Sequence, residues 1–175
     1  LLTASVDSTV LLWNIYQGKP IKTFRKAHNH LVYFVNFSPD GKYILSVGYD
    51  QKINVYDREL NLLNSISTDI RPGTIEFSPD GTKVLFGFIE EGAQHCQLYD
   101  FKEGKLKLLT NFEEHKEIVL ATRFLNDSTA ITAGGEDNEI LFWTWGKPAA
   151  GKLAKTKVVK RLIGKGHSVW GVAMT

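Results

Sequence analysis

A hydroxyl, an imidazole and a carboxylate recur close together in the sequence, and side chains of these three types can form a nucleophilic triad. The set is Ser46, His28 and Asp50. A triad serine needs a sharp turn that exposes its hydroxyl, with N–H groups nearby to hold an oxyanion. Ser46 instead lies within YILSVGY, a short apolar run typical of a buried strand. The sequence therefore favours a structural role for these residues, and we assign no catalytic residue.

Two further patterns suggest ligand chemistry but lack a necessary residue. Residues 146–153, GKPAAGKL, fit a phosphate-binding G-x-x-x-x-G-K loop, yet Leu153 stands where a Ser or Thr must ligate Mg²⁺. The HNH triplet at 28–30 and the adjacent His95 and Cys96 have no further ligands at the spacing of a metal site. We expect no cofactor, no metal site and no enzymatic activity.

The composition is that of an ordinary folded protein. Hydrophobic residues make up 43% and charged residues 23% of the 175 positions, and the formal net charge is +2. No apolar run approaches the roughly 18 residues of a membrane-spanning helix. The one cysteine, Cys96, cannot form an internal disulfide, which favours a reducing, cytoplasmic location. The sequence opens in LLTASV without an initiator methionine, and we expect it to be an excerpt of a longer chain.

An internal repeat accounts for the elements that position these residues. Trp13, Tyr56, Tyr99 and Trp143 close similar short runs, at spacings of 43, 43 and 44 residues. Runs such as VYFVNF and KVLFGFI are rich in β-branched and aromatic residues and are bounded by turn residues. A period of about 40–45 residues with four short strands is typical of propeller blades. The sequence therefore predicts an all-β fold.

The repeated SPDG turns, the Gly166-His167 pair and the histidine-to-aspartate spacing of 22 residues resemble the WD-repeat β-propeller family. The resemblance covers essentially the whole chain. It implies blades of four antiparallel strands and about four blades' worth of chain, sixteen strands in all. The expected blades are 1–26 (partial), 31–67, 73–112, 118–163 and 168–175 (partial). Three arrangements stay open. The chain could close into a four-bladed ring, form part of a longer ring, or pair with a second copy.

The resemblance also implies a buried hydrogen-bond network in each blade. Its members are His28, Ser46, Asp50 and Tyr56 in the second blade, Thr3, Asp7 and Trp13 in the first, and His115, Asp137 and Trp143 in the fourth. Ala133 occupies the position expected for the hydroxyl of the fourth blade, so that network is expected to be incomplete. The third blade has Thr68 at the histidine position and EEGAQHC in place of the aspartate turn, and we expect it to depend more on packing.

Basic residues gather in one segment near the end of the chain. From Lys147 to Lys165 there are seven basic residues and no acidic one. A solvated rim loop that leads into an outer strand explains this segment without a partner. A functional interpretation is a loop for an anionic partner, centred on Lys147, Lys152, Lys155 and Lys157. No aromatic residue lies between Lys147 and Lys165, so nucleic acid is not expected as that partner.

The resemblance implies a non-enzymatic scaffold that binds proteins or peptides on a rigid ring. The turns of the top face place Asn29, Tyr49, Lys116 and Glu136 as candidate partner-binding residues. One alternative is a cytoskeletal or ciliary scaffold whose basic loop meets acidic tubulin tails. The other is a propeller that binds a small ligand or catalyses a reaction at the channel mouth. Because fold does not fix function, these partners are expectations by analogy.

Overall fold

The structure is a computed structural model that describes residues 1–90, 96–135, 138–166 and 168–173. Every regular element in these ranges is a β-strand, and the fifteen strands form four antiparallel sheets. The prediction of an all-β fold with four-stranded sheets is confirmed. No helix long and apolar enough to cross a membrane occurs in the described part of the chain.

Consecutive strands pair with each other in every sheet. The first sheet contains β1 (Leu2–Ala4), β2 (Val10–Asn14) and β3 (Lys19–Phe24). The second contains β4 (Val32–Phe37), β5 (Tyr43–Gly48), β6 (Lys52–Asp57) and β7 (Leu62–Ser67). The third contains β8 (Pro72–Phe77), β9 (Lys83–Phe88), β10 (Cys96–Lys102) and β11 (Lys105–Phe112). The fourth contains β12 (Val119–Asn126), β13 (Thr129–Gly134), β14 (Glu139–Trp145) and β15 (Thr156–Ile163).

The two SPDG segments form the same tight turn between the first two strands of a sheet. The Ser38 hydroxyl donates to Asp40 at 2.6 Å, and the Ser78 hydroxyl donates to Asp80 at 2.6 Å. Gly41 has φ +68° in the left-handed region, which glycine adopts without the strain that a Cβ causes. The chain can therefore reverse directly from β4 into β5.

The core lies between neighbouring sheets and inside no single sheet. Phe86 and Tyr99 of the third sheet belong to one buried cluster with Leu45 and Val55 of the second. Between the third and fourth sheets, Phe112 stacks on Trp143 with ring centroids 4.3 Å apart. The strand β9 is buried on both faces, as expected for a strand with a sheet on either side. Each sheet thus depends on its neighbours to cover its faces.

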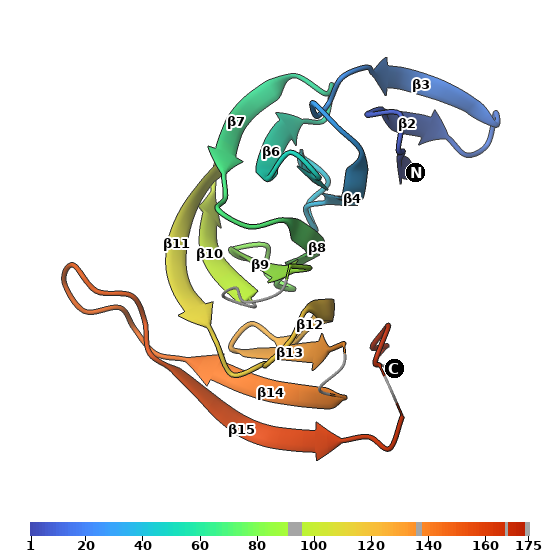
Figure 1. Cartoon of the computed structure of the whole chain (residues 1–175). Helices are drawn as coiled ribbons and strands as arrows, with labels where there is room; N and C mark the ends of the chain where they lie inside the picture. The colour runs from blue at the N-terminus through green and yellow to red at the C-terminus, as the bar shows by residue number, and fades with distance from the viewer. Residues whose placement is uncertain (91–95, 136–137, 167, 174–175) are drawn as a thin grey trace.

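The sheets follow one another along an open arc, with β1–β3 at one end and β12–β15 at the other (Figure 1). The first strands β4, β8 and β12 lie on the inner side of the arc, and the outer strands β7, β11 and β15 form its rim (Figure 1). A sixteenth strand was expected near the end of the chain, and the described part of that segment, residues 168–173, is not in a strand. Within these residues, Val169 donates its backbone N–H to the Gly134 carbonyl at 3.4 Å. One such hydrogen bond does not form a strand ladder.

Candidate functional site

The hydroxyl, imidazole and carboxylate of the second sheet meet as the sequence suggested. His28 Nδ1 lies 2.7 Å from Asp50 Oδ1, and His28 Nε2 lies 2.7 Å from the Ser46 hydroxyl. The Tyr56 hydroxyl lies 3.5 Å from that of Ser46 and donates to the Ala27 carbonyl at 3.0 Å. The set joins the loop before β4, the strand β5, the β5–β6 turn and the strand β6.

Burial decides what this set can do chemically. Ser46 is 0% and His28 2% exposed, so no substrate reaches the hydroxyl. Burial lowers the pKa of His28 from its usual value, and the Asp50 hydrogen bond opposes that shift. Asp50 also accepts the backbone N–H of Asn29 at 2.9 Å. The carboxylate therefore ties the loop before β4 to the β5–β6 turn, and the trio acts as an internal clamp.

The first sheet divides its polar residues into two local pairs. Trp13 donates its Nε1–H to the Thr3 hydroxyl at 2.8 Å. Asp7 accepts the Thr9 hydroxyl at 2.6 Å, and this hydrogen bond lowers the pKa of the Asp7 carboxyl. Thr3 and Trp13 therefore hold β1 to β2, while Asp7 orders its own turn.

In the fourth sheet Thr132 supplies the hydroxyl beside His115, so the expectation from Ala133 that this sheet lacks the hydroxyl was wrong. Thr132 Oγ1 lies 2.8 Å from His115 Nε2. Register explains the difference: Trp143 pairs with Ala130, so Thr132 holds the place that Ser46 holds in the second sheet, where Tyr56 pairs with Ile44. The Nε1–H of Trp143 finds no acceptor among the described residues. Asp137 lies outside the described residues.

The third sheet replaces the polar set with aromatic packing. Phe86 stands at the hydroxyl position, because Tyr99 pairs with Val84 two residues earlier, and the Phe86 and Tyr99 rings meet edge to face at 5.5 Å. Burial raises the pKa of Tyr99 to about 12. Thr68 uses its hydroxyl on the Gln51 and Ile70 carbonyls. Of the segment EEGAQHC at 90–96, which replaces the aspartate turn, residues 91–95 lie outside the described residues.

The top-face residues are not all brought together. Tyr49, 41% exposed, sits in the β5–β6 turn, and the exposed Asn29 lies across the Asp50 clamp from it. Lys116 belongs to the turn before β12, and the third sheet lies between that turn and the second sheet (Figure 1). Glu136 lies outside the described residues. Among the candidates that the structure describes, Asn29 and Tyr49 lie beside the same Asp50 carboxylate turn.

Residues that the sequence analysis missed complete the surroundings of Tyr49. The His30 ring lies 4.5 Å from the Tyr49 ring and the Tyr33 ring 6.3 Å from it, measured between centroids. The Arg71 guanidinium carbon lies 4.7 Å from the Tyr49 centroid, in cation–π contact. Arg71 enters from the segment before β8, so this contact joins the second and third sheets. We call His30, Tyr33, Tyr49, Arg71 and Glu90 the Tyr49 surface.

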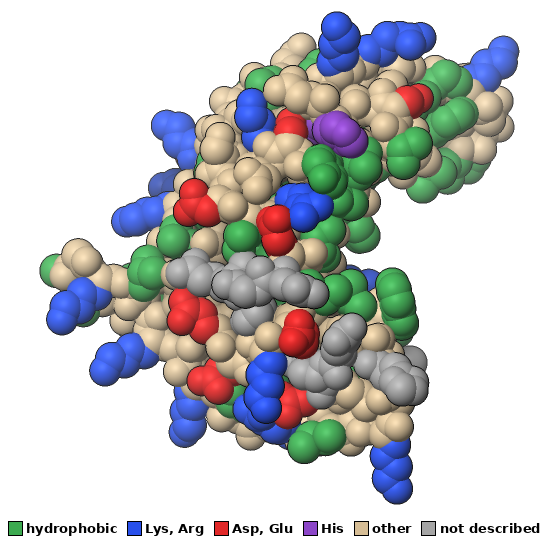
Figure 2. Space-filling view, viewed as in Figure 1, with side chains coloured by type: hydrophobic (Ala, Val, Ile, Leu, Met, Phe, Trp, Pro, Cys, Tyr) green, Lys and Arg blue, Asp and Glu red, His purple; other side chains and the backbone are tan. Residues whose placement is uncertain are grey.

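Glu90 holds Arg71 in place on this surface. Arg71 donates to Glu90 at 2.8 Å through its guanidinium and at 3.2 Å through its backbone N–H. The pair raises the pKa of Arg71 and lowers the pKa of Glu90, each through the hydrogen bond between them. On the face drawn in Figure 2, histidine, basic, acidic and hydrophobic side chains lie side by side. His30 had a sequence signal in the HNH triplet, whereas the contact of Arg71 with Tyr49 joins two repeats and no spacing within one repeat indicates it.

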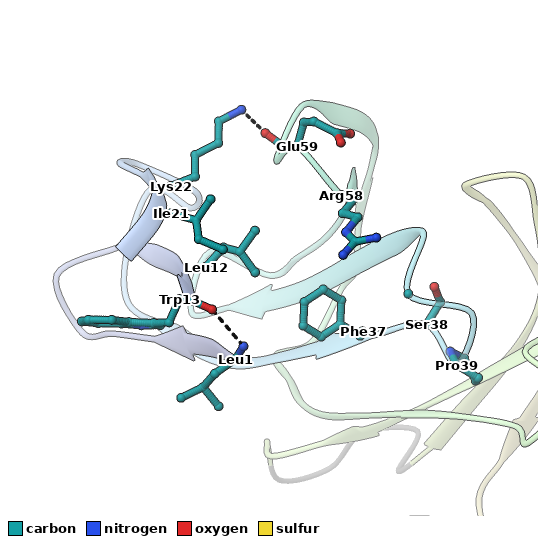
Figure 3. A pocket seen from close by; sticks show the side chains of 11 residues that line it. Leu1, Leu12, Trp13, Ile21, Lys22, Phe37, Ser38, Pro39, Arg58 and Glu59 are labelled. Atoms are coloured by element: carbon teal, nitrogen blue, oxygen red, sulfur yellow. Dashed lines mark hydrogen bonds between the residues drawn. The ribbon is translucent and has the colours of Figure 1, made fainter. Parts of the chain in front are cut away.

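A cavity with a volume of about 720 Å³ lies between the first and second sheets. Leu12, Ile21 and Phe37 give it an apolar wall, and the Lys22 ammonium is used on the Glu59 carbonyl (Figure 3). Its lining holds no histidine, cysteine or aspartate. No group of three His, Cys, Asp or Glu side chains suited to a metal ion occurs in the described ranges. Lys22, Arg58 and Glu59 place charged groups at the other side of this cavity.

The basic segment forms a long connection on the rim. Lys147, Lys152 and Lys155 are exposed in the loop between β14 and β15, and the exposed Lys157 is in β15. The β15 strand pairs with β14 along its length, so this segment contains no helix and no phosphate-binding strand-loop-helix. The loop projects from the rim beside β11 (Figure 1).

Comparison with known proteins agrees with this repeated architecture. The family of the WD domain, G-beta repeat, matches residues 18–57 and 106–144. Each matched segment begins near the outer strand of one sheet and ends near the third strand of the next. The sequence unit is therefore offset by one strand from the sheet that it builds.

Several curated proteins are similar to the chain. Human pre-mRNA-processing factor 17 is 23% identical over 150 residues, which are 85% of this chain and 25% of that protein. Mouse WD repeat-containing protein 25 is 28% identical over 82% of this chain and 28% of its own length. Drosophila melanogaster actin-interacting protein 1 is 28% identical over 61% of this chain and 17% of its own length. The chain thus spans about a quarter of the length of the first two relatives. The two matched segments are thus similar to WD repeats, and the recurring sheets around them have the arrangement that such repeats build.

Proposed function

We propose that the chain forms part of a non-enzymatic scaffold that binds a protein or peptide through the Tyr49 surface. The observation that carries this proposal is the partly exposed Tyr49 ring. It contacts His30 from the loop before β4 of its own sheet and Arg71 from the segment before β8 of the third sheet. Tyrosine and arginine are enriched among the residues that dominate binding energy at protein interfaces. A ring that is already fixed by its neighbours loses little conformational entropy when a partner covers it.

The buried clamp beneath the surface supports a rigid binding site. Asp50 follows Tyr49 directly in the chain and is held by both His28 and the backbone of Asn29. The aromatic cluster therefore rests on a turn that has little freedom to move. We therefore assign the buried trio of His28, Ser46 and Asp50 a structural role. A scaffold of this kind does not require a reaction centre.

The names of the relatives support protein partners in general. One relative is named for pre-mRNA processing and another for interacting with actin. None of the relatives described above is named for tubulin, and tubulin tails and a ciliary or cytoskeletal location are not favoured as specific assignments. The cytoplasmic location that the lone cysteine favours stays a prediction.

Photocrosslinking from the Tyr49 position tests the proposed function. The chain is prepared with benzoylphenylalanine at position 49, and separately at position 16, where the native Tyr16 is 95% exposed on the first sheet. Each is irradiated in an extract of the cell that expresses the protein, and adducts are identified by mass spectrometry. We expect a protein adduct from position 49 that Arg71→Ala weakens and that position 16 does not form. The same adducts from both positions, or none from position 49, would contradict the proposal.

The small-ligand or enzymatic alternative makes a different prediction. It requires specific thermal stabilisation of the chain by a nucleotide or metal from a panel, well above buffer controls. A scaffold that acts through Tyr49 predicts no such stabilisation. A specific thermal shift would replace the scaffold by this alternative.

A further inference from the structure

The loop between β14 and β15 folds back onto the neighbouring sheet. Ala154 donates its N–H to the Leu109 carbonyl of β11 at 2.8 Å, and the Thr110 hydroxyl of the same strand donates to the Ala154 carbonyl. Within the loop, Gly146 N–H donates to the Lys155 carbonyl at 2.9 Å, and Lys152 N–H to the Ala149 carbonyl at 3.0 Å. These bonds close the loop at its base and at its tip, so it is a built part of the rim.

A hollow lies between this loop and the third sheet. It consists of two neighbouring cavities of about 470 Å³ and about 390 Å³, which share Asp100, Leu109 and Pro148 in their linings. The side chains that give it its character are Lys107, Leu109, Lys147, Pro148, Lys152 and Leu153. We call these six residues the rim groove.

The rim groove combines apolar walls with uncompensated positive charge. Leu153 is 45% exposed and faces the hollow together with the more deeply buried Leu109. Lys107, Lys147 and Lys152 form no ion pair with any carboxylate of the described residues. Asp100 is the one acid in the two linings, and it already faces Lys83 at 3.5 Å. The surface thus presents three lysines around a small apolar hollow.

We propose that the rim groove binds an acidic linear peptide that carries two adjacent large apolar side chains. The apolar side chains fill the hollow against Leu109 and Leu153, and flanking carboxylates meet Lys107, Lys147 and Lys152. Complementary charge speeds the encounter and selects the partner, while the buried apolar contact slows its release. The site is on the rim and is independent of the Tyr49 surface on the second and third sheets.

A peptide fits this chemistry better than a nucleic acid does. Single strands bind by stacking bases on free aromatic rings beside a basic track. The one aromatic residue in the two linings is Trp145. Its ring packs edge to face on Trp143 at 5.8 Å and on Phe124 at 6.0 Å, so it is engaged in the core. The groove therefore offers lysines without a stacking platform.

Fluorescence anisotropy of the whole chain with a fluorescein-labelled peptide, EEDLFEEDE, tests the proposal. We expect saturable binding that weakens as ionic strength rises from about 50 mM to about 300 mM, because salt screens exposed charges. The peptide EEDSSEEDE, with the same charge and no apolar residue, should bind less tightly. Equal binding of the two peptides, or none by the first, would overturn the proposal.

Matched variants locate the binding. The triple change Lys107→Ser, Lys147→Ser and Lys152→Ser should weaken binding by about tenfold or more. The control triple change Lys19→Ser, Lys102→Ser and Lys165→Ser removes the same charge from exposed positions elsewhere and should leave binding close to that of the parent. Equal loss in both triples would mean general attraction to a basic protein and would refute the groove.

Further measurements test the apolar contact, the independence of the two proposed sites, and competition by another anionic ligand. Leu153→Ser, which keeps every charge, should weaken EEDLFEEDE and leave EEDSSEEDE unchanged. Tyr49→Ala, which alters only the other proposed site, should have no effect, so failure at one site is distinguishable from failure at the other. Displacement of the peptide by an equal concentration of oligothymidylate would assign the groove to nucleic acid and overturn the proposal. Thermal unfolding of every variant confirms that the fold is kept.

Discussion

Thr132 Oγ1 lies 2.8 Å from His115 Nε2, and this threonine stands one residue before the position at which the repeat spacing placed a hydroxyl. In the first and second sheets the hydroxyl precedes its aromatic residue by 10 positions, as in Thr3 to Trp13, whereas Thr132 precedes Trp143 by 11. The additional residue lies between the paired positions Ala133 and Ile140, which are seven apart where Val47 and Ile53 are six apart. The pairing register therefore keeps the hydroxyl within hydrogen-bond distance of the histidine, although the interval between the hydroxyl residue and the aromatic residue differs.

Thr132→Val tests this contact. The change keeps the shape of the side chain but leaves a buried nitrogen of His115 without this partner, and we expect the free energy of unfolding to fall by about 1–3 kcal/mol. Urea unfolding followed by tryptophan fluorescence measures it. Thr129→Val, at the half-buried start of the same strand, is the control and should change stability by less than about 0.5 kcal/mol. Equal effects of the two changes would contradict the assignment.

Ala133→Ser tests whether strand pairing or the repeat interval along the chain decides which residue supplies the hydroxyl. The spacing alone suggests that a hydroxyl here completes the network and stabilises the sheet. Ala133 is 0% exposed and Thr132 already occupies the histidine, so the register predicts that the new hydroxyl is buried without that partner. We expect destabilisation by about 1–3 kcal/mol, again from urea unfolding. A gain in stability would show that the spacing was the better guide.

Gly48→Ala should break the clamp under the Tyr49 surface. A Cβ on Gly48 would lie 2.5 Å from His28 Nδ1 and 3.0 Å from an Asp50 oxygen, so the imidazole must move away from its carboxylate. We expect a loss of about 1–3 kcal/mol, the range found for overpacked cores, measured by chemical unfolding. Gly171→Ala has no atom within 4 Å of the added carbon and serves as the control. A neutral Gly48→Ala would mean that the clamp does not constrain the turn.

The buried imidazole of His28 should make stability depend on pH. Burial holds the folded pKa below the usual value of 6.5, so at pH values between the two the unfolded chain binds more protons than the folded chain. The free energy of unfolding therefore rises with pH in this window. The contribution is complete above about pH 6.5 and is lost as the pH falls below that value.

Two measurements check this dependence. An NMR titration of the His28 ring should give a midpoint below 6.5, and unfolding at a series of pH values should show a slope that His28→Asn reduces. His30→Asn, at an exposed position, should keep the slope of the parent protein. A His28 midpoint above 6.5 would reverse the sign and disprove the interpretation.

The aromatic packing of the third sheet predicts that truncation of Phe86 lowers the stability of the fold strongly. Phe86 is 0% exposed and takes the place that a hydroxyl occupies in the other sheets. Phe86→Ala should lower the free energy of unfolding by about 3–5 kcal/mol, because it opens a cavity beside Tyr99. Phe34→Ala, at a phenylalanine that is 39% exposed, should have a clearly smaller effect in the same assay. Similar losses at both positions would place the main core elsewhere.

Local chemistry explains what could be read from the sequence. The strands, the SPDG turns and the His28–Ser46–Asp50 set were all accessible, because turn geometry and pairing within one sheet depend on residues at short, recurring distances. Gly41 must adopt a positive φ in any chain that turns there, whatever packs against it. The same rules repeat in each sheet, and this is why the family resemblance could be recognised.

Contacts between sheets were decided only by the tertiary structure. Arg71 over Tyr49, the loop at 146–155 against β11, and Phe112 on Trp143 join residues of neighbouring repeats. They depend on how far one sheet is rotated and shifted against the next, and no interval along the chain records that geometry. The sequence by itself thus determined the strands and the buried clamp of the second sheet. The packing of sheet on sheet determined which side chains share a surface, because apolar faces approach closely wherever their shapes fit.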